Sequence, residues 1–148
     1  MLTCRQFTML FSFLGLLLTA QDVWAIEFGI GQSKEELGLK YELSVVDHGT
    51  GRVTIVLDIA DAGKLKPINS ISLYIPEEGT TGRPDLMVSL ATTKVDGKTQ
   101  VRAHMKKELA ERAQLQLKTT SDPRTGKPTP LTRYYFTIHV DEFIRDKN

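Results

Sequence analysis

The chain contains very little cysteine or tryptophan, and neither charge is in excess. Its one cysteine, Cys4, and its one tryptophan, Trp24, both fall within the first 25 of 148 residues. Beyond that stretch there is no thiol to form a disulfide, bind a metal or act as a nucleophile. The 19 Lys and Arg side chains nearly balance the 18 Asp and Glu side chains, so the total charge does not indicate nucleic-acid binding.

Motifs for catalysis and for cofactors are also absent. The sequence contains no G-x-S-x-G nucleophile elbow, and no spacing of acidic residues matches an EF-hand loop. Its histidines, His48, His104 and His139, lack the close spacing that is typical of zinc ligands, so no cofactor is expected. These absences favour a binding protein over an enzyme.

The N-terminal 25 residues have the pattern of a secretory signal peptide. Arg5 precedes a short apolar run from Phe7 to Leu18, and Val23-Trp24-Ala25 ends the polar segment that follows. The apolar run is shorter than the ~20 residues that span a membrane, so no transmembrane segment is expected after cleavage. Cleavage after Ala20 or after Ala25 fits the pattern, which predicts a secreted or periplasmic protein.

Period-2 alternation of apolar and polar residues dominates the rest of the sequence and predicts β-strands. The alternating segments are 39–47, 53–60, 71–75, 86–90, 100–105, 113–119 and 134–140. Turn residues separate these segments, and the glycine-rich turn at 48–51 favours a β-hairpin. The sequence therefore predicts an all-β, antiparallel sandwich of seven strands over residues 37–145, after a flexible leader at 26–36. It resembles immunoglobulin and fibronectin-III domains in architecture alone.

The stretch from Thr99 to Thr119 carries conflicting signals. Its composition favours a helix, and a long helix over residues 100–117 would make the protein α+β. Both ends of the stretch alternate with period 2, however, and the preceding Asp96-Gly97 pair is typical of a hairpin turn that leads into a strand. We therefore predict two strands joined by a short helical crossover near residues 106–112.

Charge is divided unevenly between the two halves of the sequence. Residues 26–82 hold five basic and nine acidic side chains, a net charge of −4, whereas residues 83–133 hold eleven basic and five acidic ones, a net charge of +6. A basic face for an acidic partner, including another copy of the chain, is one interpretation. The other is an evenly mixed surface after folding. The candidate ligand-binding residues are Arg102, Lys106, Lys107, Arg112 and Lys118, with Tyr74 and Tyr135 as stacking side chains.

The sequence favours an exported binding or adhesion-type module whose unknown partner lies in the envelope or outside the cell. The alternative is a small hydrolase that is metal-dependent or uses a pair of carboxylates. Weak candidates for its metal site are Asp58, Asp61, Glu77 and His48. Self-association is compatible with either function.

Overall fold

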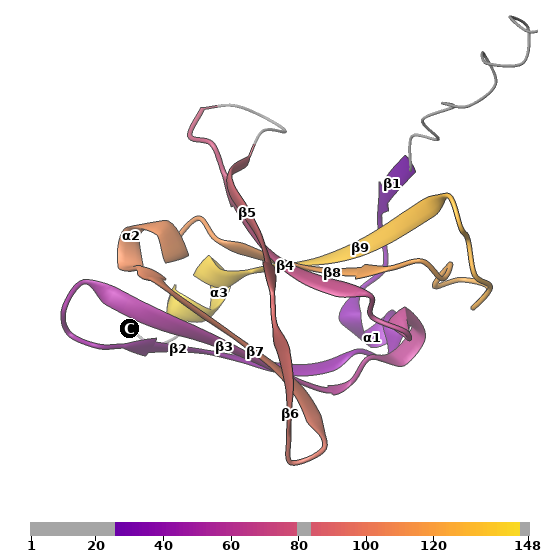
Figure 1. Cartoon of the computed structure of the whole chain (residues 1–148), viewed down its shortest axis with the longest axis horizontal. Helices are drawn as coiled ribbons and strands as arrows, with labels where there is room; N and C mark the ends of the chain where they lie inside the picture. Colours follow the sequence, from indigo (N-terminus) through magenta and orange to yellow (C-terminus); the bar gives the residue numbers. More distant parts are fainter. Residues whose placement is uncertain (1–25, 80–83, 146–148) are drawn as a thin grey trace, which may run out of the picture.

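Two β-sheets form most of the structure, which is a computed structural model (Figure 1). It describes residues 26–79 and 84–145, so the predicted signal peptide lies outside the described residues. Sheet A has the order β1-β9-β8-β4-β5, with β1 Ile26–Gly29, β4 Ser70–Pro76, β5 Pro84–Leu90, β8 Gln114–Thr119 and β9 Thr132–His139. Sheet B has the order β2-β3-β7-β6, with β2 Lys40–Asp47, β3 Arg52–Asp61, β6 Thr92–Val95 and β7 Lys98–Lys106. The mostly β, two-sheet architecture predicted from the alternation is confirmed.

Within residues 26–79 and 84–145, four short helices connect or end the strands. They are α1 Lys34–Leu37, the 3₁₀ helix η1 Gly63–Leu65, α2 Lys107–Ala110 and α3 Val140–Arg145. None of the helices in the described part of the chain is long and apolar enough to cross a membrane.

The strand number differs from the prediction, because nine strands rather than seven occur among the described residues. The first additional strand, β1, lies in the predicted leader and pairs in parallel with β9. Helix α1 starts within the predicted leader and ends one residue after it, and it begins with a capping box between Ser33 and Glu36. The second, β6, is a four-residue strand that precedes the predicted turn at Asp96-Gly97. Both additional strands are too short to show a period-2 pattern.

The ambiguous stretch folds as two strands and a short helix. β7 pairs with β3 on one side and β6 on the other, so its backbone hydrogen-bonding groups are used by the ladder on both sides. α2 then forms the crossover to β8 in the other sheet. The predicted crossover is confirmed, and the alternative of one long helix is wrong.

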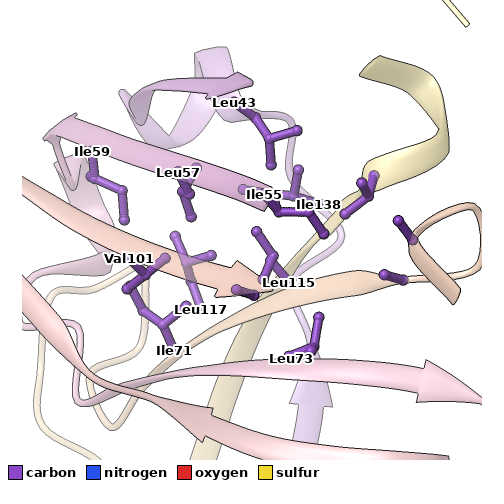
Figure 2. Packing of buried hydrophobic residues seen from close by; sticks show 14 of the residues in the cluster. Leu43, Ile55, Leu57, Ile59, Ile71, Leu73, Val101, Leu115, Leu117 and Ile138 are labelled. Carbon is purple, nitrogen blue, oxygen red and sulfur yellow. The ribbon is translucent and has the colours of Figure 1, made fainter. Parts of the chain in front are cut away.

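The core lies between the two sheets. Figure 2 shows Ile55 and Leu57 of β3 pointing toward Leu115 and Leu117 of β8, and all four side chains are at most 1% exposed. Complete burial of one such side chain stabilises the fold by roughly 1.5–3 kcal/mol. This alternation sends the intervening residues of β3 and β7 to the outer face of sheet B.

The helix α3 closes one end of the core against β2. The ring of Tyr41 lies 6.3 Å from that of Phe143 and 6.5 Å from that of Phe136, between centroids. Burial raises the pKa of Tyr41, and the nearby Glu142 and Glu35 carboxylates raise it further. These aromatic contacts attach the C-terminal helix to the sandwich.

β5 and β6 form one extended segment that changes sheets. Only Ala91 separates them, yet β5 pairs with β4 in sheet A and β6 pairs with β7 in sheet B. The two hairpins that contain these strands project in opposite directions from the body of the sandwich (Figure 1).

Candidate functional site

The outer face of sheet B carries a network of hydrogen-bonded polar side chains. Each inward residue of β3 is followed by an outward one, and the same holds for β7. Pairing of these strands places their outward side chains directly opposite one another. The pairs are Arg52 with Lys106, Thr54 with His104, Val56 with Arg102, and Asp58 with Gln100.

Two histidines meet at one threonine in this face. His48 Nε2 lies 2.6 Å from Thr54 Oγ1, and His104 Nδ1 lies 2.8 Å from the same oxygen. Both histidines are exposed, whereas Thr54 is only 6% exposed. A hydroxyl has one proton, so between two neutral imidazoles it donates to one ring nitrogen and accepts from the other. The tautomers of the two histidines are therefore linked through Thr54.

The position of His48 depends on the turn between β2 and β3. Its backbone N–H donates to the Arg52 carbonyl at 3.0 Å, and Gly49 and Gly51 adopt positive φ angles of 70° and 71°. Asp47 Oδ1 accepts from the backbone N–H of Gly49 at 2.8 Å. Because several hydrogen bonds set the turn, His48 is directed back over β3.

An ion pair attaches this turn to α2. Lys107 Nζ lies 3.0 Å from Asp47 Oδ2, and the Lys107 backbone N–H donates to the Gly51 carbonyl at 3.0 Å. The pKa of Asp47 is lowered, first by the hydrogen bond from the Gly49 N–H and then by Lys107. Lys107 is therefore engaged within the protein rather than directed at a ligand.

A second hydrogen-bonded chain continues along the same face. Gln100 Nε2 donates to Asp58 Oδ1 at 2.7 Å, and Arg102 Nε donates to Gln100 Oε1 at 2.8 Å. Gln100 is only 7% exposed although it faces outward, and its amide is hydrogen-bonded to both Asp58 and Arg102. The exposed Arg102 is thereby oriented by a buried amide.

The predicted basic residues divide between the two sheets. Arg102 and Lys106 lie together on the outer face of sheet B, and Lys107 follows them in α2. Lys118 lies in sheet A, opposite Ser70 and Tyr135. Arg112 lies just before β8, where Nη1 donates to the Pro76 carbonyl at 3.3 Å and the guanidinium pairs with Asp85 at 3.5 Å. The structure thus brings two of the five onto one face.

The two predicted stacking residues share the outer face of sheet A but not a common position. Tyr74 lies in β4 opposite Gln114, and Tyr135 lies in β9 opposite Lys118, with β8 between them. Both rings are half-buried. They do not form one aromatic platform.

The four candidate metal ligands have separate partners. Asp58 accepts from Gln100, His48 contacts Thr54, and Asp61 binds Lys66 at 2.8 Å. Lys66 and the Gly63 backbone N–H lower the pKa of Asp61. Glu77 is exposed in the segment after β4. Among the described residues, no group of three or more His, Cys, Asp or Glu side chains is placed to hold a metal ion.

The residues that sequence reasoning missed are Thr54, Gln100 and His104, together with Arg52. Alternation predicted that Thr54 and His104 face outward, whereas Arg52 lay outside the predicted strand; only the pairing register places Thr54 opposite His104. The hairpin turn at 48–51 fixes the register of β2 on β3, whereas that of β3 on β7 is set between distant segments.

The site cannot be interpreted by analogy. No protein-family model, no curated protein and no solved structure matches the sequence. Its function must therefore be inferred from its own geometry.

Proposed function

We propose that this chain is an exported, non-catalytic binding module of the immunoglobulin-like type that binds an acidic partner. The N-terminal sequence pattern supports export. Strand order supports the immunoglobulin-like type. With β1 set aside, β2-β3-β7-β6 corresponds to the order A-B-E-D, and β9-β8-β4-β5 corresponds to G-F-C-C′.

The proposed binding surface is one end of the outer face of sheet B. We name it the basic patch and define it as Arg52, Arg102, Lys106, His48 and His104. All five side chains are exposed, and none of the ion pairs found in the described residues involves Arg52, Arg102 or Lys106. Their charges are therefore available to an external anion.

The observation that carries the proposal is the pair Arg52 and Lys106. The two residues lie directly opposite each other on adjacent antiparallel strands, and both are exposed. Like charges in this arrangement destabilise a sheet, by about 0.2–1 kcal/mol on the scale of cross-strand pairs. A bound anion between them relieves the repulsion, so the arrangement favours binding at the expense of stability.

An acidic polysaccharide fits this surface best. The patch is an open face of pleated sheet, so an extended chain of carboxylate or sulfate groups can lie along it and contact several cations together. The exposed imidazoles of His48 and His104 lie beside these cations. Attraction between exposed charges is screened by salt, so binding must weaken as ionic strength rises.

The test measures binding and stability on the same double variant. Dextran sulfate is the probe, with uncharged dextran as the control ligand. We expect dextran sulfate to bind at 50 mM salt and binding to fall more than tenfold at 300 mM salt. Arg52→Gln with Lys106→Gln should weaken binding at least tenfold and, without ligand, raise the midpoint of thermal unfolding.

The matched control is Lys64→Gln with Lys127→Gln. Both of these lysines are exposed, lie outside the basic patch and change the net charge by the same amount. Equal loss of binding in the two double variants would show that net charge alone attracts the polymer, and the proposal would fail. If the protein bound only to vesicles that contain anionic lipid, the ligand of the basic patch would be a membrane surface and not a polysaccharide.

A further inference from the structure

β5 is the least protected of the sheet edges in the described part of the chain. The other edge strands are short or charged: β1 and β6 have four residues each, and β2 carries Lys40, Glu42 and Asp47. β5 has seven residues, and its last five, Leu86 to Leu90, are uncharged. Proteins normally protect an exposed edge with charge, proline or a bulge, because an unprotected edge pairs with other strands.

The apolar surface of β5 is also uncovered. Leu73 and Ile75 of β4 are 5% and 1% exposed, whereas the residues paired with them on β5, Val88 and Leu86, are 41% and 42% exposed. Met87, on the other face of the strand, is 50% exposed. The row of apolar side chains on β4 therefore continues onto β5. On β4 these side chains are buried in the core, whereas on β5 they are exposed to solvent.

We infer that the free edge of β5 pairs in antiparallel orientation with β5 of a second copy of this chain. The inward row of β5 consists of Leu86, Val88 and Leu90, so its residue types have the same order in either strand direction. A two-fold axis at Val88 places each Leu86 opposite Leu90 of the second copy and the two Val88 side chains opposite each other. Every pair in this row is then apolar, and two five-stranded sheets join into one.

The charges at the two ends of the extended segment favour the same partner. Asp85, which also pairs with Arg112 of its own chain, stands at the start of β5, and Lys94 follows in β6. An antiparallel second copy brings the acidic end of each segment toward the basic end of the other, and Asp85 lies opposite the uncharged Ala91. Pairing in parallel would instead align like charges.

The predicted dimer is weak. A standard protein interface contains about 20–30 residues from each partner, and β5 contributes seven. We expect a dissociation constant on the order of 10–100 μM, because main-chain hydrogen bonds and one apolar row provide most of the contact. This association uses the edge of sheet A, so it is independent of the binding proposed for sheet B.

Sedimentation equilibrium over protein concentrations from 1 to 500 μM tests the inference. The protein should dimerise within this range, and Val88→Lys should remain monomeric because it places two lysines opposite each other. Val46→Lys is the matched control, since Val46 is 47% exposed on another edge strand, β2. A monomeric wild-type protein over the whole range would overturn the inference, as would equal loss of the dimer in the two variants.

Cysteine cross-linking tests the register. In a Cys4→Ser background, Val88→Cys places two thiols opposite each other, whereas Met87→Cys faces Ser89 of the second copy. Mild oxidation should give a disulfide-linked dimer at least tenfold faster with Val88→Cys. Preferential cross-linking of Met87→Cys would overturn the proposed register. Thermal unfolding within a few degrees of wild type should confirm that each exposed-site variant is folded.

Discussion

Lys107 Nζ lies 3.0 Å from Asp47 Oδ2, and this ion pair attaches the first turn of α2 to the turn between β2 and β3. The contact joins two segments that are 60 residues apart in the sequence. It fixes the turn that directs His48 toward Thr54.

Asp47→Asn should lower stability at neutral pH by a small amount, because both side chains of the pair are half exposed. The pKa of Asp47 is lowered below its usual 3.8 by the Gly49 N–H and by Lys107. The ionised Asp47 carboxylate therefore contributes its full stabilisation above pH 3.8. This stabilisation is lost as the pH falls through the lowered pKa of Asp47. Urea denaturation at pH 7, 4 and 2 measures this, with Glu108→Gln as the control. A difference between wild type and Asp47→Asn that persists unchanged at pH 2 would contradict the assignment.

Thr54→Val should alter two histidines together. The substitution keeps the shape of the side chain and removes the hydroxyl that both imidazoles contact. We expect a loss of about 1 kcal/mol in unfolding free energy. In NMR spectra, the ring signals of His48 and His104 should both shift, while those of His139 on sheet A remain unchanged. A shift of only one of the two rings would show that the contacts are independent.

Leu57→Ala should destabilise the protein strongly. Leu57 is 0% exposed at the centre of the core, and removing such a side chain costs about 2–5 kcal/mol through lost burial and the remaining cavity. Val46→Ala on the neighbouring strand should cost less than about 0.5 kcal/mol, since Val46 is 47% exposed. Chemical denaturation of both variants compares the two sites. Similar losses would mean that the core is not located between the sheets as described.

Gly63→Ala should be more harmful than Gly49→Ala, although both glycines have positive φ angles, of 53° and 70°. A Cβ at Gly63 would overlap the backbone carbonyl of Leu37, whereas a Cβ at Gly49 has no heavy atom within 4 Å. Gly49→Ala therefore carries only the backbone strain, about 1–2 kcal/mol, and Gly63→Ala adds a steric clash. Thermal unfolding of the pair measures the difference. Equal midpoints would argue against close packing of η1 on α1.

Strands with alternating side chains were predictable from the sequence, and β1 was not. Each residue of β3 alternates between the core and the outer face, so burial alone produces a visible pattern. β1 has four residues, two of them Phe28 and Gly29, and it is held by a partner at the other end of the chain. No local pattern indicates such a parallel pairing.

The candidate site was predictable only in part, because residues close in sequence separate in space. Arg102 and Arg112 belong to one basic stretch, but the crossover through α2 takes the chain from sheet B to sheet A between them. Conversely, Arg52 and Lys106 come from the acidic and basic halves of the sequence and become direct neighbours. Such a pair depends on tertiary register, which single-sequence patterns do not contain.

The parallel pairing of β1 with β9 determines how this domain resists a pulling force. β1 is the first strand and β9 the last, and they lie side by side with the same direction. Tension applied at the two ends of the described chain pulls these strands in opposite directions along their length. The hydrogen bonds between them are then loaded together in shear rather than opened one after another, as in an antiparallel hairpin pulled at its ends. The short first strand β1 therefore gives the domain mechanical resistance along the line that joins the two ends of the described chain.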